Sequence, residues 1–204
     1  MKLMIASDIH GSAFYCEKMI EAYKREGADR LLLLGDILYH GPRNDLPEGY
    51  APKEVIAMLN PLKSELLCVR GNCDTEVDQM VLQFPILADY ALLVLDGKTF
   101  YATHGHVFNQ DHLPPMQDGD ILVLAGSIPD TMPESMYMDI MEHLQNKKLN
   151  IVVDATKDLL INVLAYHPFL IKPNNHELGE IFHETITEKD DVVKYAKKLQ
   201  EKGA

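Results

Sequence analysis

The first half of the chain contains three short apolar runs, each followed by polar residues. The runs are residues 2–7, 30–34 and 65–69, and each has the length of a buried strand. The segments between them have helical periodicity, so the order along the chain is strand, helix, strand, helix, strand. This alternation predicts an α/β fold in which the strands form a sheet.

Two helices are expected between these strands. In the first, Tyr15, Met19 and Ala22 share one face, and Gly27 ends the helix. The second is expected over residues 52–60, because the proline at its start suits the first turn of a helix.

The second half of the chain continues the alternation. Asp96-Gly97 is a hairpin signal between two strand-like runs. Further strands are expected at residues 121–124, 151–153 and 169–171. Helices are expected from Pro133, over residues 156–164, and over residues 189–201 with Val192, Ala196 and Leu199 inward. The stretch 114–119, rich in Pro, Gln, Asp and Gly, is the expected boundary between parts 1–119 and 120–204.

Composition limits the classes of function. The 204 residues are 47% hydrophobic and 25% charged, which is the balance of a soluble globular protein. The formal net charge of −12 repels the phosphate backbone, so general nucleic-acid binding is not expected. A small phosphate ester drawn to bound metal cations is compatible with this charge.

Cysteine usage and the N-terminal sequence favour the cytoplasm. Cys16, Cys68 and Cys73 are odd in number and scattered, so no disulfide framework is expected. The first residues lack the pattern of a signal peptide, and no apolar stretch has the length of a membrane span. The sequence does not indicate an oligomeric state.

Metal-ligating residue types follow several of the predicted strands. They are Asp8, His10, Asp36, Asn72 and His104. In open α/β sheets, ligands bind beyond the carboxyl ends of the strands. Hydrolysis of a phosphodiester needs charge neutralisation on the phosphoryl oxygens and a hydroxide nucleophile, and two divalent cations supply both.

Each of these pieces has a simpler interpretation by itself. An Asp after a strand is often a helix cap, a lone His is usually a surface or core residue, and an Asn beside Gly usually marks a turn. Four such motifs in order, each at a strand end, favour a metal site.

The motifs DIHG, GD, GNCD and THGH, in that order, resemble the calcineurin-like metallophosphoesterase superfamily. The stretches GDILYHGPRNDLPEGYAP and RGNCDTEVDQM are similar to the YfcE-type phosphodiesterases within it. The resemblance covers about residues 1–119. It implies a metallophosphoesterase-like sheet with flanking helices and a dinuclear centre, with manganese first among the metals and zinc, iron or nickel as alternatives.

The resemblance also implies roles for residues. Asp8, His10 and Asp36 would hold one metal, and Asp36, Asn72 and His104 would hold the second. This makes Asp36 the bridging carboxylate.

Three further residues join Asn72 as catalytic candidates. Cys73 stands where many relatives have a catalytic His, which implies that the leaving group is protonated in another way. Asp74 would orient the ligands, and His106 is the second histidine of THGH. Arg43 is a candidate phosphate contact or, equally, an exposed loop residue.

One motif of the superfamily is missing. A Gly-His-x-His motif, with one His for each metal, is expected after the strand at 120–124, but Ala125-Gly126-Ser127-Ile128 stands there. Water, His106, His112 or His167 are candidates to fill the two vacant ligand positions.

The second part of the chain resembles a different family. LVLAGSIPDTMPESMY, IVVDAT and FLIKPNNHELGE are similar to the ribokinase (PfkB) family, nearest to bacterial phosphofructokinases acting on fructose 1-phosphate. In that family the residues matching Asn174 and Glu177 help to organise magnesium and phosphate. The sugar-binding and Gly-rich catalytic segments have no counterpart here, so we expect ribokinase-like βα units that serve as a scaffold in a chimeric chain.

Three functions follow from these patterns. The first is a metal-dependent phosphodiesterase acting on a small phosphate diester and impaired by the missing motif. The second is an inactive metal-binding or scaffold protein, and the third, ranked last, is a sugar-phosphate kinase fragment.

Overall fold

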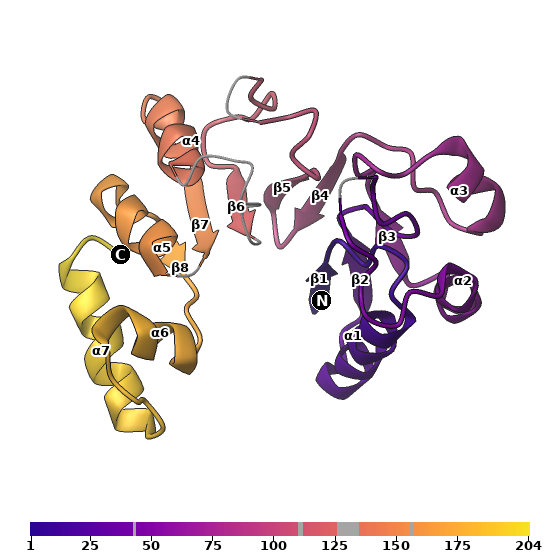
Figure 1. The fold of residues 1–204 in the computed structure, drawn as a ribbon. Helices are drawn as coiled ribbons and strands as arrows, with labels where there is room; N and C mark the ends of the chain where they lie inside the picture. Colours follow the sequence, from indigo (N-terminus) through magenta and orange to yellow (C-terminus); the bar gives the residue numbers. More distant parts are fainter. Residues whose placement is uncertain (43, 110–111, 126–134, 156) are drawn as a thin grey trace. The chain divides into compact units, whose positions relative to one another are not determined.

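The computed structural model describes residues 1–42, 44–109, 112–125, 135–155 and 157–204. The chain divides into two compact units (Figure 1). Unit 1 comprises Met1–Leu95 and Tyr101–His112, and unit 2 comprises Asp96–Phe100 and Leu113–Ala204.

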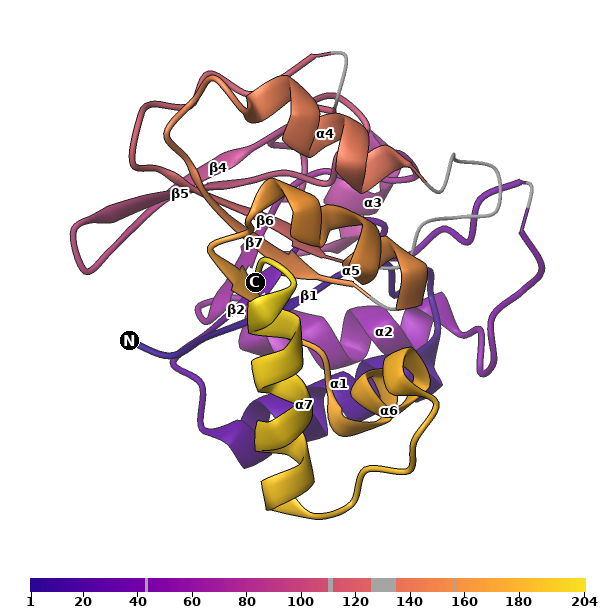
Figure 2. The same cartoon turned by 90° about the vertical axis from the view of Figure 1, so that its left-hand side faces the viewer.

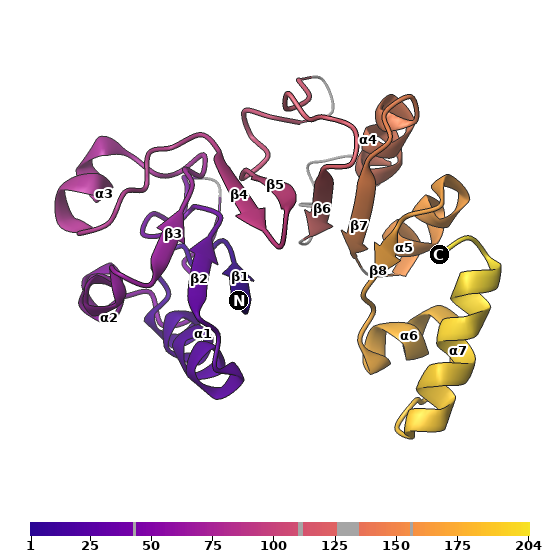
Figure 3. The ribbon, with the colours of Figure 1, turned by 180° about the vertical axis from the view of Figure 1, so that it is seen from behind.

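Unit 1 is built on a parallel three-stranded sheet. Its strands are β1 (Leu3–Ala6), β2 (Arg30–Leu33) and β3 (Leu66–Cys68), with β2 in the middle (Figure 3). The register places Ala6 beside Leu33, and Leu33 beside Cys68. Because all three strands run in one direction and end level with one another, the residues that follow them meet at one edge of the sheet.

The helices of unit 1 are α1 (Ala13–Glu26), α2 (Pro52–Leu59), the short 3-10 helix η1 (Asn60–Leu62) and α3 (Glu76–Val81). The hydroxyl of Ser12 caps α1 by accepting from the N–H of Tyr15, and Gly27 ends it in the left-handed conformation, with φ 58°. Both expected helices are confirmed, whereas α3 was not predicted.

The buried face of α1 differs from the predicted stripe. Cys16, Ile20 and Tyr23 face the core, while Tyr15 is 52% exposed. The alternative stripe has the same spacing, so periodicity could not choose between two apolar faces one residue apart. The core of unit 1 also includes Leu31, Leu33, Val55, Leu59, Leu82, Phe84 and Ile86.

A hairpin links β4 (Ala91–Leu95) to β5 (Lys98–Ala102). Its two turn residues, Asp96 and Gly97, have φ values of 50° and 75°, as the predicted Asp-Gly turn requires. The second sheet has the strand order β4-β5-β6-β7-β8.

Unit 2 consists of strands followed by helices. Its remaining elements are β6 (Ile121–Ala125), α4 (Met136–Leu144), β7 (Asn150–Asp154), α5 (Lys157–Val163), the 3-10 helix η2 (Leu164–Tyr166), β8 (Leu170–Ile171), α6 (Asn175–Phe182) and α7 (Lys189–Glu201). The strands β6, β7 and β8 pair in parallel, and α4 and α5 lie on one face of them (Figure 2). The α/β class predicted for the whole chain is confirmed.

Two details of unit 2 differ from the expectations. The predicted inner face of α7 included Ala196, but Ala196 is exposed, and Tyr195 is buried with Leu199. The helix α6 was not predicted, although its cap residues belong to a motif noted above. The expected helix start at Pro133 lies outside the described residues, and so do Gly126, Ser127 and Ile128.

Candidate metal centre

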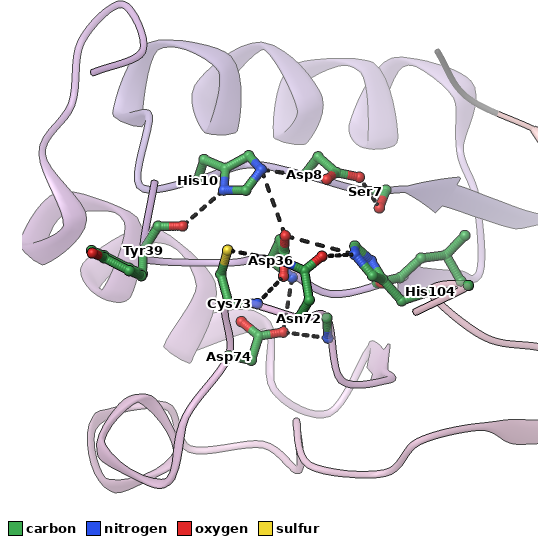
Figure 4. A network of polar contacts seen from close by, with 12 residues as sticks. Ser7, Asp8, His10, Asp36, Tyr39, Asn72, Cys73, Asp74 and His104 are labelled. Atoms are coloured by element: carbon green, nitrogen blue, oxygen red, sulfur yellow. Dashed lines mark hydrogen bonds and ion pairs between the residues drawn. The ribbon is translucent and has the colours of Figure 1, made fainter. Parts of the chain in front are cut away.

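The candidate site lies at the carboxyl edge of the unit 1 sheet. Asp8 and His10 follow β1, Asp36 follows β2, and Asn72 follows β3. His104 follows β5 and belongs to the same unit. The five predicted metal ligands are therefore brought together, as Figure 4 shows.

Asp36 is the centre of this arrangement. It is only 2% exposed, and its Oδ2 lies 3.7 Å from Nε2 of His10 and 3.6 Å from Nε2 of His104. Its other oxygen, Oδ1, accepts a hydrogen bond of 2.7 Å from the N–H of Cys73. One carboxylate oxygen is thus held by the backbone, and the other faces two imidazoles (Figure 4).

Both histidines are oriented by backbone carbonyls. Nδ1 of His10 lies 2.7 Å from the carbonyl oxygen of Tyr39, and Nδ1 of His104 lies 2.7 Å from that of Leu34. A carbonyl oxygen only accepts, so each Nδ1 carries the hydrogen, and Nε2 of the neutral ring has its lone pair directed at the site. This is the arrangement in which proteins hold a metal-binding histidine.

Asp8 and His10 form an ion pair across the site. Oδ1 of Asp8 lies 3.4 Å from Nε2 of His10, and this contact is the main cause that raises the pKa of His10 to about 9. Burial acts in the opposite direction on Asp8, but the bonds to His10 and Ser7 hold the pKa of its carboxyl below the ordinary value. A cation that binds here must displace the proton of His10.

The amide of Asn72 and the ring of His104 show that the site suits a cation. Oδ1 of Asn72 lies 3.0 Å from Nε2 of His104, and in the neutral ring both atoms offer lone pairs. Carboxylate and amide oxygens together with imidazole nitrogens form a donor set for divalent metals. The residues therefore fit the metal ions that the motifs imply.

Asp74 binds the backbone of two loops instead of facing the ligand atoms. Its Oδ2 accepts from the N–H groups of Asp36 and Gly71, both at 2.8 Å, and its Oδ1 accepts from Ile37 at 2.9 Å. The carboxylate is only 8% exposed. Asp74 therefore ties the loop after β3 to the loop that carries Asp36.

The backbone at the site is strained and closely packed. Asp8, His10 and Asp36 all have left-handed φ values, of 59°, 49° and 55°. A Cβ added at Gly71 would lie 2.0 Å from Oδ1 of Asp36, and one added at Gly35 would lie 2.2 Å from the nitrogen of Gly71. These two glycines allow the loops after β2 and β3 to touch.

Distances group the donors differently from the resemblance. Among histidine, cysteine, aspartate and glutamate side chains of the described residues, ligand atoms lie within 4.8 Å of one another in two sets. One set is His10, Asp36 and Cys73, and the other is Asp8, Asp36 and His104. Burial, followed by the charge of Asp36, raises the pKa of the Cys73 thiol to about 12.

His106 lies next to the ligand cluster. Its ring centroid is 5.4 Å from that of His104, and its Nδ1 is buried without a hydrogen-bond partner in the described structure. Burial lowers the pKa of this ring.

The other candidates fall outside this cluster. The ring of His112 packs against Phe108 with centroids 5.2 Å apart, and His167 belongs to unit 2, at the end of η2. Arg43 lies outside the described residues.

Asn174 and Glu177 form the N-terminal cap of α6. The side chain of Asn174 accepts from the N–H groups of His176 and Glu177, and the carboxylate of Glu177 accepts from the N–H of Asn174 at 2.7 Å. In this capping box, both residues stabilise the start of α6.

Sequence reasoning missed the carbonyl groups of Leu34 and Tyr39. Every residue carries a carbonyl, so no residue type marks the two that orient the histidines. The only sequence feature that could have indicated these two carbonyls is that Leu34 and Tyr39 follow β2, close to Asp36.

Comparison with known proteins identifies both parts of the chain. The model of the calcineurin-like phosphoesterase superfamily domain matches residues 1–128, and that of the pfkB family carbohydrate kinases matches residues 89–204. The chain belongs to the calcineurin-like phosphoesterase superfamily in its first part and to the pfkB family in its second. Both predicted resemblances are confirmed, while the boundary at residue 119 stays a prediction.

The first part of this phosphoesterase chain has a relative of known structure. Phosphodiesterase YfcE of Escherichia coli K12 is 50% identical over 123 residues, which are 60% of this chain and 67% of the relative. A solved structure of Yfce, described as a phosphoesterase from E. coli, matches with a TM-score of 0.58 over 60% of this chain and 68% of that one. The first part is therefore a hydrolase domain of the metallophosphoesterase class.

The second part of the chain matches a smaller share of the length of its relatives. The 1-phosphofructokinase of Bacillus subtilis is 45% identical over 89 residues, which are 44% of this chain and 29% of the relative. The chain thus spans less than a third of that kinase.

Proposed function

We propose that the protein is a metal-dependent phosphodiesterase that hydrolyses a small phosphate diester at a dinuclear centre in unit 1. The observation that carries the proposal is the placement of Asp36. Its buried carboxylate oxygen faces His10 and His104, each of which directs Nε2 toward it. A carboxylate in this position suits a bridge between two cations.

Asp8, His10, Asp36, Asn72 and His104 would hold the metals, with manganese proposed first. The cations, when bound, would neutralise phosphoryl charge and lower the pKa of a water molecule. The family resemblance implies this metal, and the mixed oxygen and nitrogen donors suit it.

The chain's own residues prepare the site in two ways. The carbonyls of Tyr39 and Leu34 hold the two imidazoles in one orientation, so little reorganisation is needed when a ligand binds. Burial lowers the pKa of His106, which favours the neutral form of its ring. Its unpartnered Nδ1 makes it the side chain that we propose for moving a proton at the reacting phosphate.

The missing Gly-His-x-His motif is proposed to weaken this centre. Residues 125–128 contain no histidine, so each metal has one protein ligand fewer than in the superfamily pattern. We therefore expect lower metal affinity and slower turnover than in a complete site.

The partner is proposed to be a small phosphate ester, with no general nucleic-acid or membrane binding. The net charge of −12 supports the exclusion of nucleic acids. In the described part of the chain, no helix combines the length and apolar character needed to cross a bilayer. The cytoplasm remains our proposed location.

Hydrolysis of bis(p-nitrophenyl) phosphate by the purified full chain tests the function. Turnover should require manganese and should be lost in Asp36→Asn, while the exposed Asp190→Asn makes the same change of charge in α7 and should keep it. No turnover from folded protein that still binds manganese would overturn the enzyme proposal in favour of a metal-binding scaffold. Phosphorylation of a sugar phosphate with ATP would instead support the kinase alternative.

A further inference from the structure

The two donor sets around Asp36 differ in chemistry. Asp8, Asp36 and His104 offer two carboxylates and one imidazole. His10, Asp36 and Cys73 offer one carboxylate, one imidazole and one sulfur. Sulfur ligands favour zinc, iron or cobalt over manganese and magnesium, so the two sets should select different ions.

The backbone holds Cys73 in its set. The N–H of Cys73 donates to Oδ1 of Asp36 at 2.7 Å, which fixes the residue beside the shared carboxylate. The side-chain amide of Asn72 donates to Sγ at 3.2 Å, which holds the sulfur beside the other donors. Figure 4 shows the sulfur, the ring of His10 and the carboxylate of Asp36 turned toward one another.

The other two cysteines have different surroundings. Cys16 is fully buried in the hydrophobic core of unit 1. Cys68, the last residue of β3, donates its S–H to the carbonyl of the next residue, Val69, at 3.3 Å. Within the described residues, Cys73 is thus the cysteine that belongs to a set of metal donors.

We propose that Cys73 is a metal ligand, and that with His10 and Asp36 it forms a pocket selective for a soft divalent ion such as zinc. The inference rests on the dinuclear centre proposed above and deepens it. On binding, Cys73 releases its thiol proton to solvent and a sulfur–metal bond forms, with no change of oxidation state. The set of Asp8, Asp36 and His104 remains suited to manganese.

Cobalt binding to the metal-free full chain tests this assignment, because a cobalt–thiolate bond has a charge-transfer band in the near ultraviolet. The wild-type protein should show this band together with the visible bands of bound cobalt. Cys73→Ser should retain visible cobalt bands and lose the charge-transfer band. Cys68→Ser is the matched control and should keep both.

Metal competition completes the test. One equivalent of zinc should remove the thiolate band, whereas manganese in excess should leave it, and Cys73→Ser should weaken zinc binding roughly tenfold or more. Visible cobalt bands without a thiolate band in the wild type, or a band that persists in Cys73→Ser, would overturn the role of Cys73 and leave the proposed hydrolase intact. No cobalt binding at all would overturn both proposals.

Discussion

The carboxylate of Asp74 accepts a hydrogen bond from the backbone N–H of Asp36, over 2.8 Å and in a buried environment. The same carboxylate also accepts from Gly71 and Ile37. A residue with no ligand atom in the site therefore sets the position of the central ligand.

Asp74→Asn tests this dependence. The amide keeps one acceptor and turns an N–H₂ group toward backbone N–H groups, so charge-assisted bonds are lost. We expect a loss of about 2–3 kcal/mol in the free energy of unfolding and a fall in metal affinity of about 10–100-fold. Urea denaturation and metal titration measure the two effects. Unchanged metal affinity would contradict the orienting role.

Gly71→Ala tests the contact between the two loops. The new methyl group would overlap the carboxylate of Asp36, so we expect a loss of stability of about 1–3 kcal/mol together with weaker metal binding. Gly27→Ala is the control, because Gly27 lies at the end of α1, away from the ligands, and has open space at its Cβ position. If both variants bound metal equally well, steric contact at Gly71 would not matter.

The buried hydroxyl of Tyr137 is expected to make unit 2 less stable at alkaline pH. Burial, with a smaller effect from the charge of Asp154, raises the pKa of its hydroxyl from 10.0 to about 12. A raised folded-state pKa means that the stabilisation is complete below pH 10 and is lost as pH rises through 12, because the unfolded state releases the proton first.

We expect a loss of about 2–3 kcal/mol across that window. Tyr137→Phe should remove this part of the pH dependence, and Tyr15→Phe, which alters an exposed ring, should retain it. Urea midpoints at a series of alkaline pH values measure the difference. A slope that is the same in Tyr137→Phe and the wild type would exclude Tyr137 as its source.

Substitution of Asn174 tests whether this residue of the pfkB part has a structural or a catalytic role. Asn174→Ala removes the cap of α6 and should lower stability by about 1 kcal/mol, while manganese-dependent hydrolysis should be unchanged. Asn174→Asp keeps an acceptor for the same N–H groups and should restore most of the stability. A large effect of either variant on hydrolysis at equal folding would show that the second part contributes to the site.

Much of the fold could be predicted because its signals are local. The apolar runs of β1, β2 and β3, the Asp-Gly hairpin turn and the range of α7 were expected from neighbouring residues. Where two apolar stripes overlap, as in α1, the choice of Cys16 over Tyr15 depends on what the helix packs against. The same reason explains why Tyr195 is buried in α7 and Ala196 is not.

The sequence by itself determined which side chains stand at the strand ends, because strand length and residue type are local properties. It therefore predicted Asp8, His10, Asp36, Asn72 and His104 as one set. Only the tertiary structure decided how these donors group, which carbonyls orient the two histidines, and that Asp74 binds backbone. Those relationships join residues that are distant along the chain, such as Leu34 and His104. They depend on distances of a few ångströms between loops, which no pattern along the sequence specifies.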